Sequence, residues 1–522
     1  DSVASSQLLG RLAGQPLELA FAVHDPAAPA IRLNIRTLVD LDQAAALGLL
    51  PDSLAAQGRL GVDLAVRAPV LAPARGTVDG TVQFDGVTVT TPALEQPVAI
   101  EGGRLVFDGQ RVRGEELQIQ AGESDVALDL TVNDWLPFAL GDSTAVASAS
   151  FDARSRLLDL DALLGTPDSA LYSKLFFARL ADRPVDGRPV DEIAEEAGLG
   201  LPPLPPIRLD GRLRAYTLRR NGLELQDVDV RVAGRGDRIE LTDARFNLMG
   251  GGVQVSGRIG IPAGTPADGE AGFPTVLTYQ LRDVGAAPFF NTLTPFRDHL
   301  TGSLLMGGTA RMVLDEYLLP RRESLTAEGT LAVNGGQLAN WTVLSALAER
   351  LGLPQFDTLT FHDWTGGFQV AGPQIALTES VIASDEVQVR TAGSFDFAGR
   401  LNLTATLLLD PAVAERMRAD VASRLTGAVA GPEGRIPLGV RITGPATEPE
   451  LALDFSRAAE NALAKARAEA QERVEAAAAK ALDGAVEQLL PQRDSLSTAA
   501  DSARARVEKE VKSRLCKIIK CD

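Results

Sequence analysis

The sequence has few of the residues on which catalytic and metal sites depend. Its 522 residues include only three histidines, His24, His299 and His362, which lie far apart and each stand next to an aspartate. General acid–base, nucleophilic and metal chemistry needs such groups in close sets. No HExxH, GxSxG or phosphate-loop motif occurs either. We therefore predict no enzyme, no metal and no cofactor, and we interpret His24 and His362 as turn residues at strand ends.

Cysteine and long apolar runs are also scarce. The two cysteines, Cys516 and Cys521, fall within the last seven residues, so no disulfide framework holds the main body together. For these two cysteines we weigh two alternatives equally: both are free thiols, or they form a disulfide beyond the end of a helix. No stretch of eighteen apolar residues occurs, and the first residues lack a basic region followed by an apolar core. We expect that the chain as written neither spans a membrane nor carries an export signal.

The charge balance is acidic, and aromatic residues are rare. The formal net charge is -18, from 51 basic and 69 acidic residues, and aromatic residues make up 5% of the chain. Nucleic-acid binding depends on clustered Lys and Arg that neutralise phosphates. We therefore predict that no nucleic acid is a partner and that most of the acidity serves solubility.

What the sequence has in abundance is alternation of apolar and polar residues. Between Ala327 and Asp410, and again near residues 126–130 and 438–442, apolar side chains recur at every second position, which places them on one face of a strand. Glycines interrupt these runs at short intervals, as in an antiparallel meander. The residues that mark this apolar face are Val126, Leu128, Leu130, Leu331, Val333, Phe368, Val370, Ile375, Leu377, Phe395, Phe397, Leu401, Leu403, Leu407, Leu438, Val440 and Ile442.

Helical patterns appear as short inserts and at the end of the chain. We predict helices at 169–181, just before 199, within 283–296, at 343–351 and after Asp410-Pro411, where Pro takes the first helical position. An Ala-rich helix and a basic one follow residue 455. The helices at 169–181 and 343–351 are candidates for plugging a groove or covering strand edges, and we favour edge cover. The predicted units are 1–165, a helical and Pro-rich insert at 166–206, 207–455, and terminal helices at 456–522.

A sheet with one apolar face needs a cover, and the sequence supplies little helix to make one. One solution is a β-sandwich or barrel that closes on itself and acts as a binding or assembly module in the cell envelope. The other is an open, curved sheet whose apolar concavity holds a lipid. Alternation fits both solutions, so these patterns leave the choice open.

Several segments resemble the AsmA family. The similarity lies in GTLAVNG at 329–335, an amphipathic helix, the GGFQV strand at 366–370, GSFDFAGRLNL at 393–403 and the closing IPLGVRITGPATEPEL at 436–451. The strands at 76–133 resemble the middle region of that family. The resemblance implies a mainly β protein with an elongated antiparallel sheet curved into an apolar groove, short helical inserts and a C-terminal helical tail. It implies roughly 25 strands and a groove roughly 120 Å long.

The same resemblance implies a function without chemistry. AsmA-like proteins are bridge-like lipid-transfer proteins, so we expect phospholipid or another acyl-chain lipid to move along the groove between the inner and outer membrane. The expected location is the periplasm, tethered to the inner membrane through a segment that precedes this chain. The marked apolar residues are the groove candidates. For the terminal helices the sequence pattern itself leaves two interpretations, of which we favour the first: a docked structural cap or partly ordered tail, or a contact with a membrane surface or envelope protein. The contact would use the basic residues Lys509, Lys512, Arg514, Lys517 and Lys520.

Overall fold

The structure is a computed structural model in which two compact units are distinguished, residues 1–456 and 457–522. It describes residues 2–12, 15–24, 29–46, 54–92, 94–140, 146–164, 169–199, 208–220, 222–261, 272–293, 297–421 and 435–454. The predicted terminal helices, with both cysteines and the five basic contact candidates, lie outside these described residues. All of the described residues belong to the first unit.

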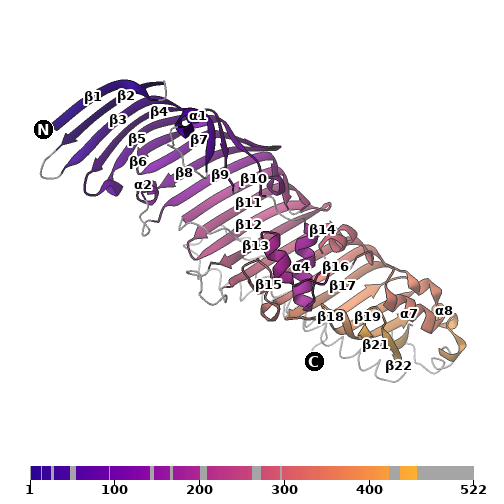
Figure 1. The fold of residues 1–522 in the computed structure, drawn as a ribbon. Helices are drawn as coiled ribbons and strands as arrows, with labels where there is room; N and C mark the ends of the chain where they lie inside the picture. Colours follow the sequence, from indigo (N-terminus) through magenta and orange to yellow (C-terminus); the bar gives the residue numbers. More distant parts are fainter. Residues whose placement is uncertain are drawn as a thin grey trace, which may run out of the picture. The chain divides into compact units, whose positions relative to one another are not determined.

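The first unit is built on one sheet of 22 strands (Figure 1). The first eleven are β1 (Ser2–Leu12), β2 (Gln15–His24), β3 (Ala30–Asp40), β4 (Ala55–Pro69), β5 (Thr77–Thr90), β6 (Val98–Gly109), β7 (Arg111–Ala121), β8 (Ser124–Asn133), β9 (Ser148–Asp159), β10 (Arg208–Arg220) and β11 (Leu223–Arg235). The others are β12 (Arg238–Leu248), β13 (Gly251–Gly260), β14 (Phe273–Gly285), β15 (Leu300–Leu314), β16 (Thr326–Leu338), β17 (Leu359–Ala371), β18 (Gln374–Ala383), β19 (Val387–Asp396), β20 (Arg400–Leu409), β21 (Ile436–Pro445) and β22 (Glu450–Asp454). The predicted mainly β fold is confirmed.

Short helices lie between the strands. They are α1 (Leu41–Ala46), α2 (Trp135–Ala139), α3 (Leu160–Leu164), α4 (Ser169–Ala181), α5 (Val190–Glu196), α6 (Ala286–Leu293), α7 (Thr342–Leu351) and α8 (Pro411–Glu415), with 3-10 turns η1 (Pro73–Arg75), η2 (Arg322–Ser324) and η3 (Pro354–Asp357). The predicted inserts at 169–181, 283–296 and 343–351 are therefore helical. Helix α8 begins at the predicted proline, and the side chain of Asp410 accepts a hydrogen bond from the backbone N–H of Ala412 at 2.9 Å.

Each strand pairs with the next one in the chain, so the sheet is a long meander. The pairs are antiparallel except β9 and β10, which run parallel. Neighbouring parallel strands need a crossover long enough to return to the starting edge. The insert with α3, α4 and α5 is that crossover, and the sheet continues through it. The parallel pair is the one departure from the predicted meander among the described strands.

The sheet is curved and unclosed. Among the described strands, β1 pairs with β2 alone and β22 with β21 alone, so the two ends do not meet. The alternative of a sandwich or barrel that closes on itself is therefore wrong for this chain. The alternation of residues could not separate the two solutions because it is the same in both.

Bulges account for much of the curvature. Register shifts interrupt the pairing of β4 with β5, β6 with β7, β7 with β8, and many later pairs up to β18 with β19. A bulge bends its strand and increases its twist. Gly103, with φ of 104°, stands at one of them, where an added Cβ would lie 2.6 Å from the carbonyl oxygen of Glu116. A row of such bulges bends neighbouring strands together.

Gly250 lies in a tight turn between two strands. Met249 and Gly250, both with positive φ, join the ends of β12 and β13. The backbone N–H groups there open into a strand and not into a helix, so no phosphate site arises. Strands β10 and β11 also form a hairpin, in which Arg220 and Leu223 are register partners.

Candidate functional site

One face of the sheet is apolar along its whole length. Register partners in adjacent strands point to the same side, so the face can be followed from strand to strand. One such line runs from Leu17 through Thr37, Val62, Val82, Leu105, Gly114, Leu130, Phe151, Gly211, Val232, Leu241, Gly257, Leu277, Ala310, Ala327, Val370, Ile375, Phe395 and Leu401. We call this surface the apolar face, and the concave channel that it lines the trough.

The opposite face of the sheet is polar and carries ion pairs between neighbouring strands. Arg36 pairs with Asp63 at 2.9 Å, and Arg104 with Glu115 at 2.8 Å. Further along, Nη2 of Arg212 lies 2.6 Å from Oδ2 of Asp229. The hydrogen bond from Arg212 holds the pKa of Asp229 below its usual range, although burial acts in the opposite direction. These charges keep the outer surface hydrated, which leaves the apolar face as the side that requires a cover.

Over β1–β9, which we call the open section, the apolar face has little cover. Leu8, Phe21 and Ile31 on this face are 55%, 39% and 38% exposed. Most larger side chains of the following strands, such as Leu128 and Leu130, are half-buried. Contiguous exposed apolar side chains of this kind are a common feature of binding surfaces.

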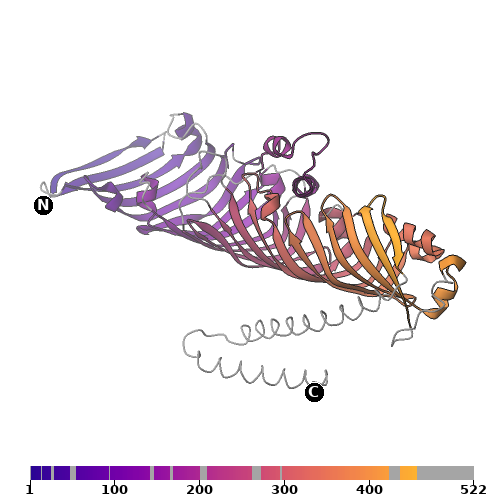
Figure 2. The same ribbon diagram turned by 90° about the horizontal axis from the view of Figure 1, so that it is seen from below.

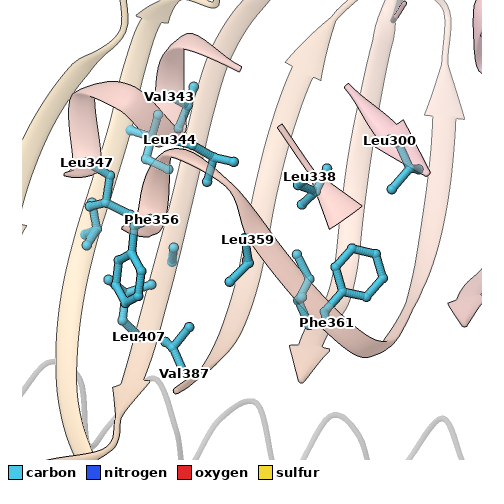
Figure 3. Close-up of a cluster of buried hydrophobic side chains, with 14 of the residues drawn as sticks. Leu300, Leu338, Val343, Leu344, Leu347, Phe356, Leu359, Phe361, Val387 and Leu407 are labelled. Carbon is cyan, nitrogen blue, oxygen red and sulfur yellow. The ribbon is translucent and has the colours of Figure 1, made fainter. Parts of the chain in front are cut away.

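Over β19–β21, which we call the closed section, most of the same face is buried. Leu407 is 2% exposed, and Leu409 and Leu438 are 0% exposed. Helix α7 and the turn η3 pack their own apolar side chains, such as Leu347 and Phe356, into the same cluster (Figure 3). Val413, Met417 and Val421 from α8 and the residues after it complete this cover.

All but one of the predicted groove candidates share the apolar face, but they differ in accessibility. Half-buried candidates are Val126, Leu128, Leu130, Leu331, Phe368, Val370, Ile375, Leu377 and Phe395. Fully buried candidates are Val333, Leu401, Leu403, Leu407, Leu438, Val440 and Ile442. The second set is a correction: these side chains form a packed core and offer no surface to a lipid.

Phe397 is the exception, because β19 ends before it at Asp396. Its ring lies in the turn to β20, with its centroid 6.0 Å from that of Phe177 in α4. The alternation of residues therefore assigned Phe397 to β19, but the strand ends one residue before it.

The prediction that α4 and α7 cover strand edges is also wrong. Helix α7 packs Leu347 into the cluster on the apolar face that contains Leu407 of β20 and Leu438 of β21. Helix α4 contacts α6 and the connection between β15 and β16. Amphipathic helices bury their apolar stripe against an apolar surface within reach. For α7 that surface is the face of the sheet, whereas α4 packs Leu175 and Ala178 against α5 and Leu319.

The candidate list missed much of the lining. Leu19, Leu33, Leu64, Val82, Leu213, Val255, Tyr279 and Met306 also lie on the apolar face. Their signal was available, since they follow the same alternation. Bulges hid part of it, because each extra residue shifts the period by one position.

The trough offers an apolar surface and almost no reactive groups. Polar side chains on this face are few: Thr37 and Thr275 bond to backbone oxygens of Pro16 and Phe273, and Nε1 of Trp364 donates to Oγ of Ser380 at 2.7 Å. Burial raises the pKa of Tyr279, the one group on this face with a shifted pKa in the described residues. An aliphatic chain can be accommodated by such a surface.

His362 lies within β17 rather than at a strand end, so that part of the prediction is wrong. Its Nε2 lies 2.9 Å from Oδ1 of Asp385, and this hydrogen bond raises the pKa of His362. Both side chains are largely exposed. His24 is the last residue of β2, as predicted. Within the described ranges, His, Cys, Asp and Glu never gather in the threes that a metal ion requires.

Comparisons with protein-family models, with curated proteins and with solved structures find no match to this chain. Each helix in the described part of the chain is too short or too polar to cross a membrane. The geometry of the trough therefore carries the functional argument, together with the sequence resemblance to the AsmA family.

Proposed function

We propose that the trough binds the acyl chains of phospholipids and lets them move along the sheet between the inner and outer membrane of a cell envelope. The observation that carries this proposal is the unbroken apolar face, which stays largely uncovered from β1 to β9. The proposal places the protein in the periplasm, as expected of an AsmA-like chain.

Hydrophobic transfer is the energy that such a trough would use. Each CH₂ group kept out of water is worth about 0.8 kcal/mol, so a lipid crossing open water pays a steep penalty. A phospholipid whose tails lie on Leu and Val side chains avoids most of it while its headgroup remains in solvent. The 22 strands, at about 4.8 Å each, extend about 100 Å. That length suits a bridge better than a small carrier.

Movement also requires that no point along the path binds much more tightly than the next. Large aromatic side chains make deep, specific pockets, and they are rare in this chain. The lining of the open section is mostly Leu, Val and Ile, with Phe21, Phe84, Phe107 and Phe151 as exceptions. A tail can therefore slide from strand to strand without a deep trap.

The decisive experiment places charge on the lining and compares it with charge on the outer face. In Leu128→Asp with Leu130→Asp, carboxylates would stand in the tail path, so transfer of fluorescent phospholipid between vesicles should fall at least tenfold. The matched control is Thr131→Asp, on the polar face of the same strand opposite Arg113. Its transfer should equal that of the parent protein.

Native mass spectrometry of the purified chain gives an independent readout. Phospholipid should co-purify with the parent and the Thr131→Asp control, and be reduced in the double variant. Circular dichroism checks that all three fold alike. Parent protein that is folded, lipid-free and inactive in transfer would refute the proposal.

A further inference from the structure

Helices α4 and α5 cross the mouth of the trough. In Figures 1 and 2 both helices lie on the concave side of the sheet, in front of the strands around β14–β16. Helix α4 contacts α6, which follows the end of β14, and it also contacts the connection 315–319, which follows the end of β15. Because β14 and β15 are antiparallel neighbours, these two ends belong to opposite rims. Tyr172 and Arg179 both bond to the rim at 315–319, and α6 reaches the helix from the opposite rim. Helix α4 is therefore in contact with elements from both rims, and we call α4 and α5 the strap.

The strap has a core of its own that does not merge with the floor beneath it. Leu175, Ala178 and Leu180 of α4 are buried, and the first two join Val190 and Ala194 of α5 in a cluster separate from that of the floor. On the floor, Leu277, Met306 and Leu331 remain half-buried. The strap therefore roofs this part of the trough without filling it.

Two paired glycines lie in the floor beneath the strap. Gly308 of β15 and Gly329 of β16 are register partners on the apolar face, flanked by Tyr279 on one side and Phe368 on the other. An added Cβ at Gly308 would overlap the carbonyl oxygen of Glu328. The rings of Tyr279 and Phe368 take up the space that side chains at these glycines would fill: an added Cβ at Gly308 would lie 3.0 Å from the Tyr279 hydroxyl, and one at Gly329 would lie 2.8 Å from the Phe368 ring.

Polar bonds latch the strap to one rim. Nη2 of Arg179 donates to Oδ2 of Asp315 at 3.0 Å and also pairs with Asp191. The hydroxyl of Tyr172 donates to the carbonyl oxygen of Leu318 at 2.7 Å. Burial, aided by the charge of Asp315, raises the pKa of Tyr172 to about 12, so the hydroxyl stays a donor. Leu319 from the rim, which is 0% exposed, packs into the core of the strap.

A lipid that moves along the trough meets a different environment at the strap. In the open section its headgroup can stay in water above the tails. Under α4 the mouth is occupied, so the headgroup would have to enter the narrow, apolar space between strap and floor and lose its hydration. Desolvating an ionised group without partners is far too costly for ready passage, and the floor offers few polar groups.

Resting on the proposed lipid-binding function, we propose that the strap is a gate: it must release from the rim at 315–319 before a headgroup-bearing lipid passes β14–β16. An ion pair and a few hydrogen bonds suit this role, because water can replace them when they open. The latched state then holds lipid in the open section, and the released state joins the two parts of the trough.

Cross-linking the strap to the rim tests the gate. The two native cysteines are first replaced, in Cys516→Ser with Cys521→Ser, and Phe177→Cys with Phe397→Cys are then added. The ring centroids of this pair lie 6.0 Å apart, so a short bis-maleimide with a cleavable spacer can join them. Vesicle-to-vesicle transfer of phosphatidylglycerol should fall at least tenfold on linking and recover on cleavage. Lipid bound in the open section should persist.

The matched control links Arg36→Cys with Asp63→Cys, which form an ion pair on the outer face of β3 and β4. That link should leave transfer unchanged. A strap-linked protein that transfers lipid as fast as before linking would overturn the gate and leave the proposed function intact. Loss of transfer already in the unlinked parent would instead remove the proposed function, and the gate with it.

A conservative variant gives a second readout that needs no cross-link. Tyr172→Phe deletes one latch bond and keeps the ring in place. It should expose the 182–189 segment to protease several-fold faster and should not slow transfer. Slower transfer in Tyr172→Phe at unchanged protease sensitivity would contradict a gate held by this bond.

Discussion

The open section at β1–β9 and the closed section at β19–β21 have the same alternation of apolar and polar residues. They differ in how far their apolar side chains are buried. In β8, Leu128 and Leu130 are half-buried, whereas Leu407 and Leu409 in β20 are buried. The sheet itself is alike in both sections. A β-strand pattern therefore specifies which side chains share a face and says little about whether that face is covered.

The cover accounts for the difference. Helix α7 places Val343, Leu344, Leu347 and Leu351 on one side, at helical spacing, and these side chains are all buried. The described helices near the open section, α1 and α2, have six and five residues and leave most of the face uncovered. Fully burying a Leu is worth about 2 kcal/mol, so a few helical turns change the local stability substantially.

The largest expected effect comes from a charge in each section. Leu407→Asp buries a carboxylate without a partner in the closed section and should prevent folding of this end of the sheet. Leu130→Asp puts the same group where water reaches it and should leave the fold intact. Circular dichroism and protease resistance measure both. If both variants folded equally well, the two sections would not differ in burial as described.

Replacing one leucine by alanine in each section tests the same difference in burial. Leu438→Ala should lower the free energy of unfolding by about 3 kcal/mol, because it leaves a cavity in a packed core. Leu128→Ala removes contacts that are only partly made and should cost about 1 kcal/mol. Urea unfolding followed by intrinsic fluorescence and circular dichroism gives both values. Similar costs would mean that the open section is covered in solution.

A bulge glycine tests what bends the open section. Gly103→Ala forces a side chain into positive φ and against the backbone of Glu116, so the free energy of unfolding should fall by about 2 kcal/mol. Its neighbour Gly102 has free space and an ordinary φ, and Gly102→Ala should change it by less than about 0.5 kcal/mol. An equal response at both positions would show that the bulge geometry is not needed.

The pH dependence at the latch has a definite sign. Burial raises the pKa of Asp315, against the N–H of Leu319 and the charge of Arg179. The folded state then binds this proton more tightly than the unfolded state, so this residue's contribution to stability is greatest below the ordinary pKa and falls as the pH rises through the raised one. Acid alone should not unlatch the strap. The sign is checked by measuring the free energy of unfolding of the parent and of Asp315→Asn between pH 3 and 7. If the contribution of Asp315 to stability rose with pH, the predicted sign would be wrong.

The smallest expected effect lies on the polar face. Arg36→Ala removes an exposed ion pair with Asp63 and should change the free energy of unfolding by about 0.5 kcal/mol or less. Lipid transfer should not change, because the outer face makes no contact with the tails. Weaker transfer in this variant would show that both faces of the sheet take part.

Much of the site could be predicted from local pattern. The alternation in Val126, Leu128 and Leu130 placed these residues on one face, and the register confirms it. Helices such as 343–351 were visible from their spacing. Bulges at Glu116 and Asp227 were not, because an acidic residue with positive φ carries no distinct signal in an alternating strand.

The sequence by itself determined most of the strands and their apolar face, since side-chain alternation is a local property. Only the tertiary structure decided which part of the face is open, that β9 and β10 run parallel, and that the strap reaches Asp315, 136 residues beyond Arg179. Those outcomes depend on contacts between segments far apart in the chain. A period of two residues contains no information about such contacts.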